Sequence, residues 1–300
     1  MIQVNDLWKS YGRHDALRGL SFEVPQGSAL ALIGANGAGK TTTIKTVMNI
    51  IEPTRGRVSI LGVDSRHITT REQAQIGYVS ESQDLPGGLT VSQYLDYLRP
   101  FYPKWDKELE VSVCRQLNLP AKQKIHNLSH GMRMKMALAC ALPFRPKLLI
   151  LDEPFSGLDP LVRDEFMEGL LAQAGEMTVL ISSHELGEIE GVATDVAFID
   201  EGSLLFQESM ADLTDRFREV RVTLDREAVV PLDAPRDWLC MRAMGSVLTF
   251  VDGRYSEADL NERVRVQCTG VKHIDTDPMT LRSIFTTLAR SSRANKGGDL

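Results

Sequence analysis

The strongest chemical signal in the sequence fits the phosphate-loop pattern G-x-x-x-x-G-K-[ST] at every fixed position: Gly34-Ala35-Asn36-Gly37-Ala38-Gly39-Lys40-Thr41. Glycines there let successive backbone N–H groups curl inward toward phosphate oxygens, which a Cβ atom would obstruct. The Lys40 ammonium supplies a mobile charge for the β- and γ-phosphates, and the Thr41 hydroxyl is suited to bind Mg²⁺. We therefore expect a nucleotide-phosphate site formed by Gly34, Asn36, Gly37, Ala38, Gly39, Lys40, Thr41 and Thr42.

A second signal is a pair of carboxylates, Asp152 and Glu153, directly after the apolar run Leu148–Leu151. A fully apolar run of this length is typical of a strand buried in a parallel sheet, and such sheets bind ligands at the carboxyl ends of their strands. Asp152 can hold Mg²⁺ directly or through water, and Glu153 can take a proton from a water attacking the γ-phosphate. An acidic turn without function would be the simpler interpretation of this pair alone, but the phosphate loop upstream favours the catalytic one.

Three more residues are candidates because of where they lie in the chain. His184 follows the apolar strand Thr178–Ser183, so in a parallel sheet it lies at the same edge as the carboxylates and can face the γ-phosphate. Ser129 is a good helix N-cap, and a helix N-terminus binds anions. Tyr11 is either a half-exposed aromatic at a strand end or a surface on which adenine stacks, and the sequence favours neither.

The elements that must position these residues follow from apolar patterning. A buried strand, Ala29–Ile33, precedes the phosphate loop and a helix, Thr42–Met48, follows it. The stretch from about residue 90 to 142 is expected to be a mostly helical insertion, with Thr90 and Ser129 as caps. Further strands are expected at Ile2–Asn5, Leu7–Tyr11, Leu20–Val24, Arg57–Gly62, Ile76–Ser80, Asp195–Asp200 and Ser203–Phe206.

The chain changes character after Phe217. Alternation predicts strands at Glu219–Leu224, Ser246–Val251 and Arg263–Cys268, and short helices are expected at Ser256–Arg263 and Leu281–Leu288. We expect a small α+β domain over residues 214–290 that packs on the first domain or dimerises, followed by a polar, disordered tail over 291–300.

Composition narrows the class of protein. The 300 residues are 43% hydrophobic and 25% charged, which is ordinary for a globular chain. The net charge of −6 offers no basic field for nucleic acid. No apolar run approaches the roughly 20 residues of a membrane span, and no secretion signal is visible at the N-terminus. The four cysteines are scattered, as expected for reduced thiols in a cytosolic protein.

Together the motifs resemble the nucleotide-binding subunit of an ABC transporter over about residues 2–213. In that resemblance Tyr11 corresponds to the A-loop aromatic that stacks on adenine, and His184 corresponds to the switch histidine. The remaining motifs occur in the family's order: Gly34–Thr41 as Walker A, Leu128–Met132 at the LSGGQ signature, Leu148–Glu153 as Walker B with its catalytic glutamate, and Ser156–Asp159 as the D-loop.

Two departures stand out within that resemblance. The signature reads Leu-Ser-His-Gly-Met, so Ser129 and Gly131 are kept while His130 replaces a glycine. In the Q-loop, Glu81 occupies the position where the family usually has glutamine, and Gln83 follows as the other candidate for that role. Both departures resemble single-domain ATPases paired with ABC-2-type membrane proteins, which are often exporters.

The resemblance implies a P-loop NTPase fold of ABC type, with a mixed sheet core and a helical subdomain over about 90–142, followed by the small α+β appendix. It implies ATP and Mg²⁺ as cofactors, Thr41, Asp152 and Glu81 at the metal, and Glu153 and His184 in catalysis. It also assigns Ser129, Gly131 and Asp159 to nucleotide binding. The implied partners are a second ATPase subunit, identical or a close paralogue, and a membrane-spanning permease on a separate chain.

Such a subunit lies on the cytoplasmic face of the cell membrane as a peripheral protein and couples ATP-driven, head-to-tail dimer closure to transport, with export of a drug or antimicrobial favoured. The alternative is a soluble ABC-type ATPase that acts on nucleic acid or a protein complex. Proteins of that class usually carry two ATPase cores, a long coiled-coil insertion or a basic face, and none is visible here. An inactive regulatory module is disfavoured because Lys40, Asp152, Glu153 and His184 are all present.

Overall fold

A computed structural model describes residues 1–175 and 177–296. The chain divides into two compact units, Met1–Glu208 and Ser209–Leu300. The division falls after Glu208 and not after residue 213, because the helix that follows it, α7 (Met210–Arg216), belongs to the second unit. Each unit has its own sheets and apolar cluster.

The centre of the first unit is a six-stranded sheet with the order β10-β9-β3-β8-β7-β6. The pairings from β9 through to β6 are all parallel, so these strands end at one common edge. Strands β3, β7 and β8 are almost entirely buried, as their apolar runs predict. The bounds are β3 Ala29–Ile33, β6 Ile76–Ser80, β7 Leu148–Asp152, β8 Thr178–Ser183, β9 Asp195–Asp200 and β10 Ser203–Ser209.

A second sheet in the same unit has the order β2-β1-β4-β5 and is antiparallel. Its strands are β1 (Ile2–Tyr11), β2 (His14–Val24), β4 (Arg55–Ile60) and β5 (Val63–Asp64). Strand β1 joins the two predicted stretches Ile2–Asn5 and Leu7–Tyr11, whereas β2 begins at His14, before the predicted start at Leu20, and Tyr11 pairs with His14 at the turn. The early part of β2 was not predicted, because register shifts between the two strands break the alternation of polar and apolar residues there.

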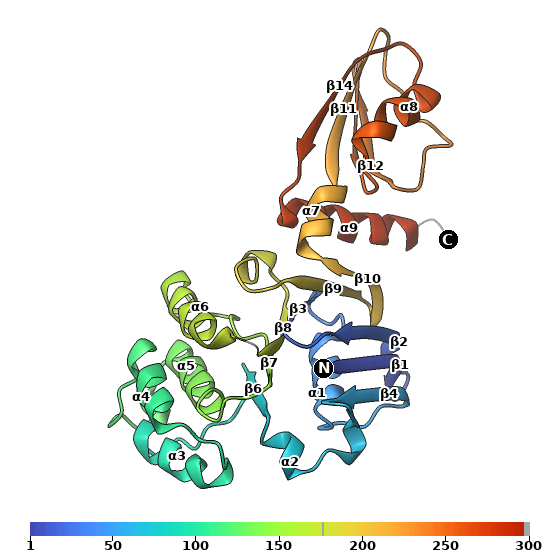
Figure 1. The fold of residues 1–300 in the computed structure, drawn as a ribbon. Helices are drawn as coiled ribbons and strands as arrows, with labels where there is room; N and C mark the ends of the chain where they lie inside the picture. The colour runs from blue at the N-terminus through green and yellow to red at the C-terminus, as the bar shows by residue number, and fades with distance from the viewer. Residues whose placement is uncertain (176, 297–300) are drawn as a thin grey trace. The chain divides into compact units, whose positions relative to one another are not determined.

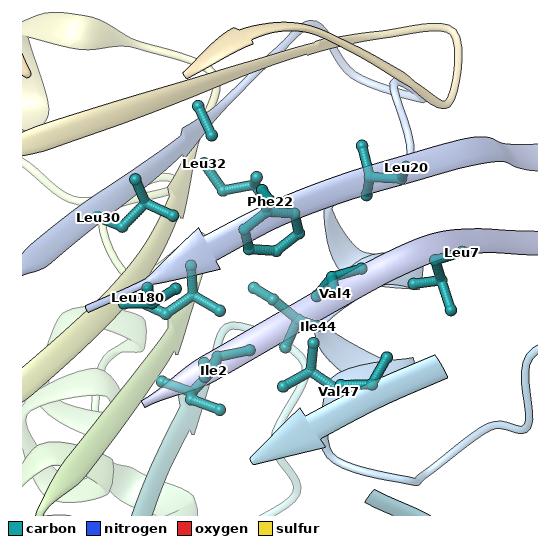
Figure 2. Packing of buried hydrophobic residues seen from close by; sticks show 14 of the residues in the cluster. Ile2, Val4, Leu7, Leu20, Phe22, Leu30, Leu32, Ile44, Val47 and Leu180 are labelled. Atoms are coloured by element: carbon teal, nitrogen blue, oxygen red, sulfur yellow. The ribbon is translucent and has the colours of Figure 1, made fainter. Parts of the chain in front are cut away.

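Helix α1 (Lys40–Val47), which follows the phosphate loop, is packed in the apolar cluster shared by these two sheets. Figure 2 shows Phe22 among side chains that come from both sheets and from α1. Ile44 and Val47 of α1 are fully buried there, so burial of apolar area fixes the helix. The cluster therefore holds the first turn of α1, and with it Lys40, in a defined place relative to the central strands.

Helices α3 (Val91–Leu98), α4 (Lys107–Gln116) and α5 (His130–Ala141) form the inserted region, which Figure 1 draws in green beside β6. Thr90, Asp106 and Ser129 cap their N-termini through their side chains. Their apolar faces share one cluster, which includes Met136 and Cys140, so the methionine there is core filler as expected. The other helical pieces are α2 Thr70–Gln73, α6 Pro160–Ala174, and 3₁₀ turns at Ser65–His67, Arg99–Phe101, Ile125–Asn127 and Leu186–Glu188. No helix in the described part of the chain has the length and apolar character needed to cross a membrane.

The second unit is a four-stranded antiparallel sheet with the order β12-β13-β11-β14. Its apolar cluster joins the sheet to α8 and includes Val222, Phe250, Leu260 and Val264. The bounds are β11 Arg218–Leu224, β12 Trp238–Met244, β13 Val247–Asp252, α8 Glu257–Gln267, β14 Val271–Pro278 and α9 Leu281–Lys296.

Two sequence expectations for this unit are wrong. Residues 263–268 do not form a strand: residues up to Gln267 belong to α8, where Leu260, Val264 and Cys268 are buried at a spacing of one helical turn while Val266 is 75% exposed. The predicted disordered tail is wrong for residues 291–296, because α9 continues to Lys296, while residues 297–300 of that prediction lie outside the described residues. Strands β12 and β14 were not predicted, since their alternating faces are largely polar or exposed.

Candidate functional site

Four neighbouring parallel strands deliver polar residues to one edge of the central sheet. Strand β3 leads into the phosphate loop, β7 ends at Asp152 and Glu153, β8 leads to His184, and β6 leads to Glu81. The carboxyl edge of such a sheet is where open α/β folds bind ligands. The side chains that the sequence suggested from separate motifs are thus assembled at one place by strand order.

The phosphate loop turns into α1 through glycines with left-handed backbone angles. Gly37 has a φ of 84° and Gly39, the N-cap of α1, has a φ of 103°, which side chains with a Cβ rarely adopt. Lys40 is 5% exposed, and its Nζ donates to the carbonyl oxygens of Gly34 at 2.6 Å and Ala35 at 3.2 Å. The ammonium is therefore held inside the curve of the loop.

Glu153 connects the loop to the switch position on β8. Its Oε1 lies 3.0 Å from Lys40 Nζ, and its Oε2 lies 2.8 Å from His184 Nδ1. Glu153 has a φ of +50°, a left-handed angle that costs a non-glycine residue about 1–2 kcal/mol. Retained strain of this kind concentrates at functional sites. The hydrogen bond that Glu153 Oε2 accepts from His184 Nδ1 is also the main reason that the pKa of His184 is raised above its ordinary value.

Asp152 is 3% exposed, and burial raises the pKa of its carboxyl group. Its Oδ1 accepts from Thr41 Oγ1 at 3.1 Å and from Ser182 Oγ at 2.8 Å, which oppose that rise. Ser182 in turn accepts the backbone N–H of Glu153 at 2.9 Å. Ser182 was not predicted as a site residue, because its pairing with Asp152 appears only in the register of the folded sheet.

These residues surround a cavity of about 510 Å³. Its lining comprises Tyr11, His14, Ala16, Asn36, Gly37, Gly39, Lys40, Thr41, Thr42, Glu81, Glu153, Ser156 and His184. Most of the predicted nucleotide contacts are therefore on one surface, including Tyr11, which is half exposed and lies under the Lys9 ammonium. The cavity is also lined by His14, Ala16 and Ser156, which were not predicted as nucleotide contacts.

Other predicted residues do not line this cavity among the described residues. Gly34 and Ala38 form the base of the phosphate loop, where the N–H of Ala38 donates to the Ala35 carbonyl. Ser129 and Gly131 lie at the start of α5, and the Ser129 hydroxyl accepts the N–H of Met132. Asp159 caps α6 by accepting the N–H of Val162 at 3.1 Å.

The two Q-loop candidates lie in different places. Glu81 lines the nucleotide cavity, and its N–H donates to the carbonyl of Asp152 at 3.2 Å. Gln83 lines a separate cavity of about 340 Å³ together with residues of the helical insertion such as Tyr94 and Leu98. Its Oε1 is buried and finds no donor in the described part of the chain.

Comparisons with known proteins agree with this site. A protein-family model described as ABC transporter matches residues 17–156. The ABC transporter ATP-binding protein YcbN of Bacillus subtilis (strain 168) is 35% identical over 219 residues, which cover 71% of each chain. The chain belongs to the ABC transporter ATP-binding proteins. It is accordingly an ATPase that binds and hydrolyses ATP.

Two further similarities place this ATPase among its relatives. The bacitracin transport ATP-binding protein BcrA of Enterococcus faecalis is 32% identical over 224 residues, covering 73% of this chain and 72% of that protein. A solved ATP-binding subunit of an ABC transporter superposes with a TM-score of 0.65 at 30% identity, covering 72% of this chain and 92% of that one. The expected ABC-type P-loop fold is confirmed.

The bond between Glu153 and His184 yields a test by titration. We expect Glu153→Gln to lower the pKa of His184, because a neutral amide cannot favour the imidazolium as the carboxylate does. The pairing contributes stability that is fully present below about pH 6.5 and is lost as the pH rises through the raised pKa. Ring NMR signals of His184 followed against pH would measure the shift. Glu190→Gln, at an exposed carboxylate, is the control, and an unchanged His184 titration in Glu153→Gln would contradict the assignment.

Proposed function

We propose that this ATPase is one of a pair of subunits that enclose ATP head to tail and drive a membrane-spanning permease on a separate chain. The observation that carries the proposal is the separation of the ATPase motifs. The cavity is lined by Lys40, Glu153 and His184, whereas Ser129 and Gly131 lie outside its lining in the described residues. A second copy of the chain can supply that missing half of the site.

Symmetry makes the exchange reciprocal. A pair related by a twofold axis gives each cavity the signature turn of the other chain, so both sites are completed by the same contact. The first turn of α5 begins at His130, directly after the Ser129 cap, and offers backbone N–H groups and the positive end of the helix dipole. These groups suit the γ-phosphate, which ADP lacks. ATP therefore favours the closed pair, and hydrolysis reopens it.

Thr41 of the cavity lining and its hydrogen-bond partner Asp152 fit a magnesium ion that accompanies ATP. Thr41 Oγ1 and Asp152 Oδ1 lie 3.1 Å apart and are hard oxygen donors, which Mg²⁺ prefers. Among the described residues no group of three His, Cys, Asp or Glu side chains forms a metal site, so phosphate oxygens and water would complete the coordination. Glu81, which lines the same cavity, is the third candidate ligand. The ion neutralises charge that develops on the phosphates.

The catalytic step follows from the partners of Glu153. When the Lys40 ammonium turns to a phosphate, it leaves Oε1 of Glu153, and that oxygen becomes free to accept a proton from the attacking water. His184 keeps hold of the other carboxylate oxygen and so fixes its orientation. Binding of ATP and exposure of the base are thus linked through one ion pair.

The proposed docking surface for the permease is the smaller cavity together with two aromatic side chains of α3 and the turn after it. The cavity is lined by Tyr94, Leu98, Gln83 and other mostly apolar residues, and Gln83 Oε1 has no donor among the described residues, so it can accept one from a partner. Tyr97 and Phe101 are 59% and 62% exposed and are in contact with each other. A short permease segment could place an apolar side chain against the cavity and the exposed aromatic residues. An N–H group of the same segment could donate to Gln83 Oε1.

We infer that the permease exports its substrate and that the subunit works at the cytoplasmic face of the membrane. The support is the similarity to a protein named for bacitracin transport. The class of substrate proposed is therefore an antimicrobial compound or a drug. No nucleic-acid partner is proposed, since the chain carries a net charge of −6.

Replacing the proposed base tests the catalytic assignment. We expect Glu153→Gln to lower the ATPase rate roughly 10²- to 10⁴-fold, because the amide cannot accept the proton, while ATP binding is retained. Steady-state phosphate release and equilibrium ATP binding would measure the two effects. Glu190→Gln serves as a control at an exposed carboxylate. A Glu153→Gln protein that hydrolyses ATP nearly as fast as the wild type would rule out this role.

A matched pair of cap variants tests the head-to-tail dimer. In the Glu153→Gln background, Ser129→Ala should weaken the ATP-dependent dimer about tenfold or more, because it removes a hydroxyl that reaches the twin's γ-phosphate. Thr90→Ala removes the cap of α3 and costs similar helix stability, about 1 kcal/mol, without touching the signature. Sedimentation in the presence of ATP would measure the dimer fraction of the Ser129→Ala and Thr90→Ala variants. Equal dimerisation of both variants would contradict the arrangement.

Changes on the docking surface test the permease contact. The double change Tyr97→Ser and Phe101→Ser removes exposed aromatic area and should reduce co-purification with the detergent-solubilised permease by at least tenfold. ATP hydrolysis by the isolated subunit should stay as in the wild type, since neither residue lines the nucleotide cavity. The double change Val229→Ser and Leu232→Ser, at exposed apolar residues of the second unit, is the control. Undiminished co-purification would exclude this surface.

A further inference from the structure

The residue that departs from the LSGGQ signature makes a bond that a glycine cannot make. His130 is the first residue of α5, and its Nε2 donates to the carbonyl oxygen of Ser156 at 3.0 Å. A carbonyl only accepts, so the proton is on Nε2. Ser156 lines the nucleotide cavity of the same chain. One side chain therefore joins the signature turn to the wall of the cavity.

Two neighbouring contacts hold α5 against α6, the helix that follows the Ser156 turn. A Cβ on Gly131 would lie 2.7 Å from Val162 Cγ1, so the absence of a side chain lets the first turn of α5 lie directly on α6. One turn further along α5, the buried Lys135 ammonium bonds to Glu165 of α6. Unlike these two contacts, the bond from His130 reaches Ser156 itself, which lines the cavity.

We propose that His130 is a positioning residue that makes the signature turn and the Ser156 turn move as one unit. This inference rests on the head-to-tail dimer proposed above. When bound nucleotide displaces Ser156, the His130 imidazole moves with it and shifts Ser129 and Gly131. These two residues contact the ATP of the twin. Each chain thereby couples ATP binding in its own cavity to ATP binding in the twin's cavity, which its signature turn completes. The coupling acts equally in both directions, because coupling between two binding sites is reciprocal.

The simpler role for His130 is that of a filler whose bond only stabilises the fold. The two roles differ in what rescues a variant. A filler can be replaced by an apolar side chain of similar size, whereas a link to the Ser156 carbonyl needs a donor that reaches as far as Nε2. Gln offers such a donor, while Leu and Gly do not.

The test uses the full chain in the Glu153→Gln background, with ATP-dependent dimerisation measured by sedimentation. We expect His130→Leu and His130→Gly to raise the dimer Kd about tenfold, which corresponds to about 1.4 kcal/mol, and His130→Gln to stay within about twofold of the parent. ADP affinity should be equal in all variants. In chains that keep Glu153, the Leu and Gly variants should also lose cooperativity of ATP hydrolysis, which His130→Gln retains.

His126→Leu is the matched control, because His126 lies just before the signature and also bonds a carbonyl, but that of Gly87 and not that of Ser156. The inference is overturned if the His130→Leu and His130→Gly variants dimerise as tightly as the parent. It is also overturned if His130→Gln raises the dimer Kd as much as His130→Leu and His130→Gly do. A parent protein that binds ATP but stays monomeric overturns the head-to-tail dimer itself and the inference with it. Comparing two donor-free variants separates loss of the bond from misfolding of either one.

Discussion

The carboxylate of Glu153 is the interaction on which the site depends. Its oxygens are divided between Lys40, from the loop after β3, and His184, from the end of β8. The residue adopts a left-handed backbone angle to make both contacts. A buried ammonium needs a counter-charge, and the carboxylate supplies it in a way that phosphate can replace. The ion pair therefore balances the buried charge of Lys40 and fixes the orientation of the Glu153 carboxylate.

Most of the catalytic edge was predictable because each part has a local signature. The phosphate loop needs glycines at fixed positions, and the apolar runs before Lys40, Asp152 and His184 read as parallel strands. Once these strands are taken as neighbours, the polar residues after them must meet. Ser182 and Ser156 were missed as site residues, since a single serine carries no spacing signal and gains its role only from a tertiary neighbour.

The errors in the second unit have a different origin. The alternation of arginine and valine over residues 263–266 satisfies a strand period and also allows a helix with one buried valine, so the period alone cannot decide. Leu260 and Cys268 favour the helix over the strand, because they extend the buried stripe around Val264 by one turn in each direction. Conversely, β14 has a partner on one side only, and its exposed outer residues leave little apolar pattern to detect.

The burial of α1 has a consequence for which substitutions the first unit tolerates. Ile44 and Val47 tie the phosphate loop to a core shared by two sheets, so substitutions there disturb the loop and the fold together. The helical insertion has its own small cluster and displays Tyr97 and Phe101 at its surface. A substitution at these two exposed aromatic residues leaves the packing around the phosphate loop unchanged. The fold thus keeps the core that positions Lys40 apart from the surface that the insertion exposes.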